Sequence, residues 1–221
     1  MLGIKKFFVG RGEYGVTLRN GQYGDYYGND YNSSRALTMQ EMEKNAEYIF
    51  KGLSNKGFSK NAICGMLGNM QTESTLNPGR WESDRVGGTP AGHGYGLVQW
   101  TPYTKYTNWC SSDPSLMDNN IDRIIFEIEN GIQWIKTPAY PLTFWEFAHS
   151  GETPEYLAQA FLRNYERPAD INQPSRSTQA RYWYNYISNI TPKPNPPQRV
   201  QNTRKWLMAR TFRINIFCDR R

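Results

Sequence analysis

A carboxylate ends an otherwise apolar stripe in the segment "NMQTES", residues 69–74. The stripe has the three- and four-residue steps of one helix face: Ile63, Met66, Met70 and Glu73. Asn77 and Pro78 follow, which predicts that the helix ends close to the acid. Apolar surroundings would raise the pKa of Glu73, as a general acid requires near neutral pH. The alternative is a glutamate that turns outward at a frayed helix end.

The segment "GHGYGLVQWT", residues 92–101, places three glycines beside hydrogen-bonding and aromatic side chains. Glycine lets the backbone approach a ligand closely, and sugars are typically held by such polar groups and aromatic faces. We therefore expect Tyr95, Gln99 and Trp100 to bind substrate. An ordinary turn around a buried tryptophan is the alternative.

Helices must position these residues, and their starts are readable. Capping boxes pair Thr38 with Glu41 and Thr143 with Glu146, while Ser59 predicts a further cap. Three more features predict helices: Thr153 before Pro154, a start near Ser175, and one isoleucine-rich face formed by Ile121, Ile124, Ile125, Ile128, Ile132 and Ile135. Only residues 79–101 could hold a short irregular hairpin. The expected fold is mainly α, with this glycine-rich insert forming one wall of a cleft.

The chain divides into three predicted parts. Residues 1–37 are rich in Gly, Tyr, Asn and Asp, which is typical of a flexible or partner-docked arm. Residues 38–191 form the helical domain. Residues 192–221 begin with a proline-rich spacer and end in a basic tail that has no clean helical or strand pattern.

Charge and composition narrow the function classes. The chain carries a net charge of +6, but the segment from Lys193 onward holds eight basic residues and one acidic residue, which leaves about −1 for residues 1–192. This nearly neutral body argues against a nucleic-acid binder. The three cysteines and two histidines are scattered, so we expect no zinc site, no other cofactor and no disulfide framework. We also expect no membrane span and no signal peptide.

Five sequence blocks resemble the phage tail lysozyme family, as found in tail-knob proteins of short-tailed Bacillus phages. They occur in the family's order: "LTMQEMEKNAEYI", "NAICGMLGNMQTESTLNPG", "GYGLVQWTP", "NYERPADINQP" and "ARYWY". The resemblance covers about residues 37–187. Glu73-Ser74 and Gly96-Leu97-Val98-Gln99 more distantly resemble motifs of goose-type lysozymes and lytic transglycosylases.

The resemblance implies a lysozyme-like α+β fold and cleavage of peptidoglycan between N-acetylmuramic acid and N-acetylglucosamine, with Glu73 as the catalytic acid. Family relatives also carry a zinc-dependent peptidase after a linker. The tail of this chain has one cysteine and no histidine, so we expect neither peptidase activity nor zinc. The "NYERP" block does not match the Ala-Tyr-Asn-rich block of the transglycosylases, which favours hydrolysis.

A second carboxylate normally assists glycoside hydrolysis. Glu82 and Asp84 in "RWESDRVGG" are candidates, as is Glu166 in "NYERP". The first two are alternatively solvated loop charges, and Glu166 alternatively pairs with an arginine that fixes a helix end. Tyr165 is a further candidate for the cleft, although core packing explains it almost as well.

Three functions stay open at this point. The first is a virion-associated muramidase at the phage tail tip or knob that acts on the host wall. A lytic transglycosylase on the same bond is the second. The third is a non-catalytic tail-tip or wall-binding protein. The arm and the basic tail would then contact other tail proteins or anionic wall polymers.

Overall fold

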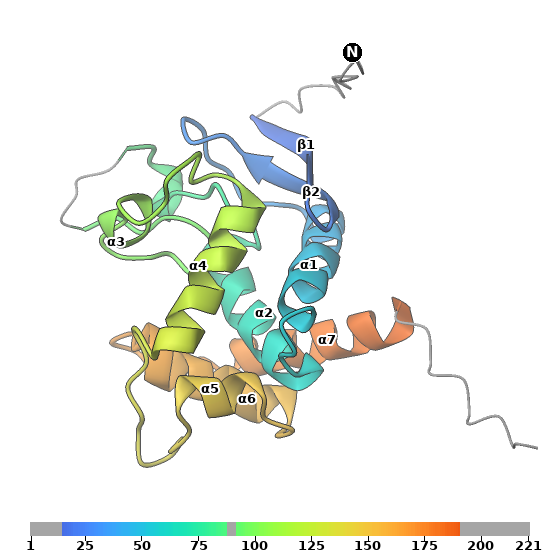
Figure 1. Ribbon diagram of the computed structural model, residues 1–221, viewed down its shortest axis with the longest axis vertical. Helices are drawn as coiled ribbons and strands as arrows, with labels where there is room; N and C mark the ends of the chain where they lie inside the picture. The colour runs from blue at the N-terminus through green and yellow to red at the C-terminus, as the bar shows by residue number, and fades with distance from the viewer. Residues whose placement is uncertain (1–14, 88–91, 191–221) are drawn as a thin grey trace, which may run out of the picture. The chain divides into compact units, whose positions relative to one another are not determined.

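The computed structural model describes residues 15–87 and 92–190. Its elements within these ranges are β1 (Val16–Gly21), β2 (Gly24–Asn29), α1 (Met39–Ser54), α2 (Lys60–Ser74), η1 (Glu82–Asp84), α3 (Thr104–Thr107), α4 (Met117–Asn130), α5 (Phe144–Ala148), α6 (Pro154–Phe161), η2 (Leu162–Glu166) and α7 (Ser175–Ile190). The mainly α fold expected from the helix-start patterns is confirmed (Figure 1).

The predicted helix starts are also confirmed. Thr38 forms a full capping box with α1, and Thr143 forms one with α5. Ser59 caps α2 through its hydroxyl, and Thr153 caps α6 with proline at the first helical position. Each cap satisfies backbone N–H groups that the first helical turn leaves without partners.

Helix α2 forms the centre of the fold and packs mainly against α7 and α6 (Figure 1). Most of its side chains are buried, including the apolar stripe Ile63, Met66 and Met70. A Cβ atom on Gly68 would lie 2.4 Å from the carbonyl oxygen of Arg176 and 2.8 Å from the backbone nitrogen of Ala180. Only glycine therefore permits α7 to lie this close to α2.

Helix α4 ends earlier than its isoleucine pattern predicts. Gly131 adopts the left-handed conformation, φ 62°, and caps the helix directly after Asn130. Ile132 and Ile135 lie beyond this cap and are 38 % and 59 % exposed, so they do not extend the buried face. The first four isoleucines of the pattern are buried as expected.

A hairpin occupies residues 16–29, where we expected an arm without regular structure. Strands β1 and β2 pair antiparallel, with Val16 opposite Asn29. The amide of Asn45 on α1 accepts a hydrogen bond from the backbone nitrogen of Tyr27 and donates one to its carbonyl oxygen, both at 2.7 Å. Tyr26 packs edge-on against Tyr48 of α1. The expectation of a flexible arm is therefore wrong for residues 15–37. The local sequence has little aliphatic content, and contacts with α1 stabilise the hairpin instead.

The glycine-rich insert, where a short irregular hairpin was considered for residues 79–101, contains two isolated antiparallel bridges, Trp81 to Tyr95 and Tyr95 to Trp100. Two side chains from the helices hold it. The Ser74 hydroxyl at the end of α2 donates to the carbonyl oxygen of Leu97 at 2.8 Å, and Asn120 of α4 accepts from the Leu97 nitrogen at 3.0 Å. The insert is thus fastened to both helices.

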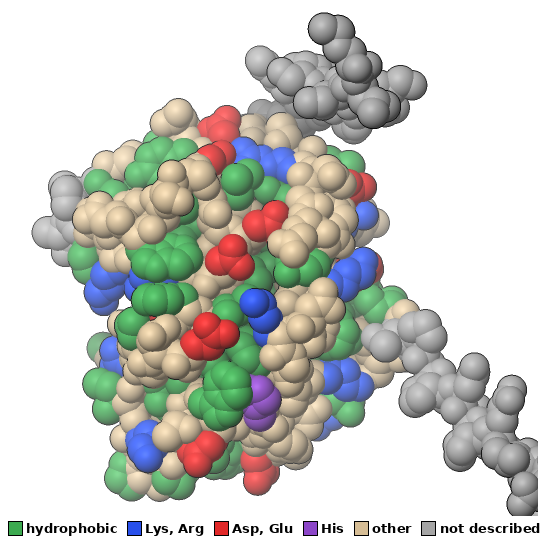
Figure 2. All heavy atoms as spheres, viewed as in Figure 1, with side chains coloured by type: hydrophobic (Ala, Val, Ile, Leu, Met, Phe, Trp, Pro, Cys, Tyr) green, Lys and Arg blue, Asp and Glu red, His purple; other side chains and the backbone are tan. Residues whose placement is uncertain are grey.

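Acidic and basic side chains are interspersed on the face shown in Figure 2, which agrees with a body of nearly balanced charge. None of the described helices has the length and apolar character required to cross a membrane. The described ranges hold no group of three metal-ligating side chains. The chain divides after Thr191, and both the predicted tail and residues 1–14 of the predicted arm lie outside the described residues.

Candidate active site

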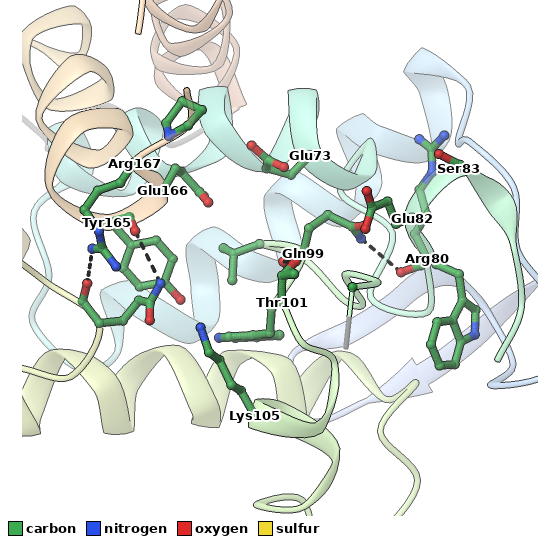
Figure 3. Close-up of a pocket in the computed structure, with 16 residues that line it drawn as sticks. Glu73, Arg80, Glu82, Ser83, Gln99, Thr101, Lys105, Tyr165, Glu166 and Arg167 are labelled. Carbon is green, nitrogen blue, oxygen red and sulfur yellow. Dashed lines mark hydrogen bonds between the residues drawn. The ribbon is translucent and has the colours of Figure 1, made fainter. Parts of the chain in front are cut away.

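A cleft of about 500 Å³ lies between the end of α2, the glycine-rich insert and the η2 turn (Figure 3). Its walls are mostly polar and carry three carboxylates and several cations. The lining residues are Glu73, Arg80, Trp81, Glu82, Ser83, Gly92, Val98, Gln99, Trp100, Thr101, Lys105, Gln133, Tyr165, Glu166, Arg167 and Pro168. Of the residues predicted from sequence, Glu73, Glu82, Gln99, Trp100, Tyr165 and Glu166 reach this cleft.

Glu73 lies at the cleft edge in the last turn of α2, but its carboxyl is not enclosed by apolar side chains as we expected. The side chain is 21 % exposed and accepts a 2.6 Å hydrogen bond from Nη2 of Arg176. The Arg176 side chain is 4 % exposed, and its other nitrogens donate to Asn69 and Gln173. The first turn of α7 thus brings a fixed cation to the end of the buried stripe. This charge-assisted hydrogen bond fixes the orientation of the Glu73 carboxyl at the cleft edge.

Glu166 ends η2, a π-helical turn that continues from α6. Such turns often occur at functional sites. Its Oε1 atom is buried and has no hydrogen-bond partner among the described residues. Burial raises the pKa of Glu166 well above its usual range, and the neighbouring charge of Glu73 raises it further. The two carboxyls point toward one another in Figure 3.

Trp100 and Tyr165 reach the cleft from different segments and share one buried anchor, Glu127 of α4. The Trp100 indole donates to Oε1 of Glu127 at 3.1 Å, and the Tyr165 hydroxyl donates to Oε2 at 2.5 Å. Arg123 completes the cluster with a 2.8 Å ion pair. Burial raises the pKa of Glu127, whereas the bonds from Tyr165 and Arg123 lower it.

Gln99 is held with its amide nitrogen turned toward the backbone. Nε2 donates to the carbonyl oxygen of Arg80 at 3.0 Å (Figure 3) and to that of Gly96 at 3.0 Å. Gln99 adopts a positive φ of 50°, which is uncommon outside glycine and often occurs at functional sites. The amide nitrogen is thus committed, and the carbonyl oxygen is the group that can accept from a ligand.

Tyr95, which was expected to bind substrate, and Asp84, one of the candidate carboxylates, do not line the cleft. Tyr95 is fully buried behind the cleft wall, 4.6 Å in ring centroid distance from Trp81. Asp84 turns away, accepting from the Ser34 hydroxyl at 2.8 Å and pairing with Arg80 at 3.3 Å. Glu82 lines the cleft, where its Oε2 accepts from the Gly94 nitrogen at 2.7 Å.

A sequence model of the family described as "Phage tail lysozyme" matches residues 44–187, which include all the cleft-lining residues. The chain belongs to the phage tail lysozyme family. The family predicted from the five sequence blocks is therefore confirmed. "Morphogenesis protein 1" of Bacillus phage B103 is 48 % identical over 161 residues. The aligned region covers 72 % of this chain and 43 % of that protein, so the chain spans less than half the length of this relative.

Several residues of the site were not predicted from sequence, and Glu127 and Arg176 are the two that hold its predicted members in place. Glu127 stands three residues after Ile124 on the apolar face of α4, so the spacing argument that selected Glu73 would also have found it. Arg176 lies in the polar first turn of α7, where nothing in the residue pattern marks an arginine as part of a site. Only the packing of α7 on α2 shows that its guanidinium meets Glu73.

Proposed function

We propose that this phage tail lysozyme hydrolyses peptidoglycan as a muramidase, with Glu73 as the general acid. The target is the β-1,4 bond between N-acetylmuramic acid and N-acetylglucosamine. One observation carries the proposal. Glu73 lies in the last turn of the central helix, beside a cleft whose facing wall is the Gly96–Gln99 turn. The Glu73-Ser74 and Gly96–Gln99 motifs both lie within the matched family region.

The cleft has the groups that a glycan strand requires. The Gln99 carbonyl oxygen can accept from a sugar hydroxyl, while Arg80 and Lys105 line the cleft with donors. Trp100 lines the same wall. Its burial and its hydrogen bond to Glu127 fix the ring in position before substrate arrives.

In the proposed reaction, Glu73 gives a proton to the glycosidic oxygen while the C1–O bond breaks and its electron pair goes to that oxygen. Positive charge develops at C1, water adds there, and the proton that this water loses restores the acid. The product has a reducing end. Proton donation of this kind contributes about 10²- to 10⁴-fold to a rate. No metal or cofactor takes part in this scheme.

The names of the family and of one relative support a place of action in the virion. The family is named for phage tails, and the relative from phage B103 is named a morphogenesis protein. Both names support association with the virion. We place the enzyme at the tail tip or knob, in contact with other tail proteins and acting on the host wall during tail penetration.

Product masses test the proposed reaction. Purified peptidoglycan is digested with the full chain, and the soluble fragments are weighed before and after borohydride reduction. A reducing N-acetylmuramic acid end that gains two hydrogen atoms is expected. A 1,6-anhydro end would instead make the enzyme a lytic transglycosylase. Salt-sensitive binding without fragments would make it a wall-binding protein.

A further inference from the structure

Glu166 is a half-buried acid whose Oε1 atom is buried without a neutralising partner. Its Oε1 has no hydrogen-bond partner, and no ion pair with Glu166 occurs among the described residues. A buried carboxylate that lacks both is costly, and such a group keeps its proton instead. The proposed muramidase reaction gives Glu166 no role, although it lines the same cleft as Glu73.

The charges around Glu166 come from four segments. Glu73 of α2 and Glu127 of α4 are negative and disfavour its ionised form. Arg176 of α7 and Arg167 beside it are positive and favour that form. Burial has the largest effect of all, and it disfavours ionisation.

Both arginines are already committed to other groups. Arg176 makes its 2.6 Å ion pair with Glu73. Arg167 donates through Nη1 to the backbone carbonyl oxygens of Gln133 and Asn164. Glu73 therefore has an ion-pair partner in Arg176, whereas Glu166 has none among the described residues. Two facing carboxyls in this arrangement do not both ionise, because like charges repel strongly at short range.

We propose that Glu73 and Glu166 share one proton, which Glu166 holds in the free enzyme and Glu73 delivers to the substrate. The shared proton is inferred from the arrangement of the two carboxyls. Its delivery to the substrate rests on the proposed muramidase function. Glu166 is thus the second carboxyl group of the site. It acts through Glu73 and need not touch the glycan.

The proton balance closes over one turnover. The proton on Glu166 moves to Glu73, which leaves Glu166 as a carboxylate. Glu73 then donates it to the glycosidic oxygen as the C1–O bond breaks. At this stage the positive charge at C1 offsets the repulsion between the two carboxylates. Water adds to C1, and the proton that it releases returns to the pair.

Carboxyl NMR tests the sharing without any activity measurement. The full chain is labelled with ¹³C at its glutamate carboxyls, and the Glu166 resonance is assigned by its loss in Glu166→Gln. We expect this resonance to titrate well above the ordinary glutamate pKa of about 4.3. In Glu73→Gln its midpoint should fall, because the neighbouring negative charge is gone. Glu82→Gln removes a different cleft carboxyl and should leave the midpoint unchanged.

An ordinary midpoint in the wild type, or the same midpoint in wild type and Glu73→Gln, would overturn the proposal. The NMR midpoints test the shared proton even if the protein cleaves no glycan. Failure of this proposal can therefore be told apart from failure of the muramidase assignment. The pH profile of peptidoglycan clearing is the second readout. Its alkaline limb should move to lower pH in Glu166→Gln and return toward the wild-type position in Glu166→Asp.

Discussion

Arg176 and Glu73 form a 2.6 Å ion pair although they are 103 positions apart in the sequence. The candidate acid is therefore held by a tertiary contact between α7 and α2. A fixed cation gives Glu73 a defined orientation at the cleft edge, which reaction geometry requires.

Replacing Arg176 by methionine should destabilise the fold. The change leaves Glu73 and the Asn69 side chain without their buried donor. Breaking a buried pair costs about 3–5 kcal/mol, and partial exposure of Glu73 reduces this to about 2–3 kcal/mol. Urea unfolding measures the effect. Arg181→Met breaks an exposed ion pair to Glu155 and should cost less than about 1 kcal/mol. Equal losses in the two variants would contradict this account of Arg176.

Stability should fall with rising pH on account of Glu166. Its folded pKa is raised above the unfolded value, so the folded state binds more protons between the two values. Unfolding free energy then decreases as pH rises, by at most about 1.4 kcal/mol per pH unit. Glu166→Gln removes this term, so the stability of the variant relative to wild type should increase from about pH 4 toward neutral pH. A difference that does not change with pH would show that Glu166 titrates normally.

Gly68→Ala tests the close contact of α2 and α7. Alanine in place of glycine inside a helix ordinarily stabilises by about 0.5–1 kcal/mol. Here the new Cβ would meet the backbone of α7 at 2.4 Å, and overpacking of this kind costs about 1–3 kcal/mol. We expect net destabilisation in thermal unfolding. Gly151→Ala has open space around its Cβ and should lie within about 0.5 kcal/mol of wild type.

Glu127→Gln should weaken both the fold and the activity. The amide has one acceptor oxygen, whereas Arg123, Trp100 and Tyr165 all donate to the carboxylate. We expect a loss of about 2–4 kcal/mol in unfolding free energy and a lower kcat/KM, because the cleft wall loses its anchor. Tyr165→Phe removes one of the three donors and should cost only about 1 kcal/mol. A larger loss in Tyr165→Phe than in Glu127→Gln would contradict the role of Glu127 as the shared anchor.

Local patterns predicted those parts of the fold that local physics decides. The capping boxes at Thr38 and Thr143 located two helices, because caps satisfy backbone groups within one turn. The β1–β2 hairpin was not predictable in this way, since Asn45 and Tyr48 of α1 supply its stabilising contacts. The end of α4 was predicted too late, because the isoleucine spacing continues to Ile135 whereas Gly131 ends the helix.

The candidate site was likewise predictable only where local patterns decide it. Periodicity placed Glu73 at the edge of the core, and the family blocks gave it a role. Its ion pair with Arg176 and its facing partner Glu166 depend on how α7 and η2 pack against α2. Tyr95 shows the converse: its type fitted a binding residue, but packing placed it behind the cleft wall.

Clearing of purified peptidoglycan by wild type and Glu73→Gln tests the central claim most directly. Glu129→Gln, an exposed substitution with the same change in charge, is the matched control, and thermal unfolding checks that all three proteins are folded. The account predicts a rate at least about 100-fold lower for folded Glu73→Gln and an unchanged rate for Glu129→Gln. Clearing by Glu73→Gln at the wild-type rate would contradict it.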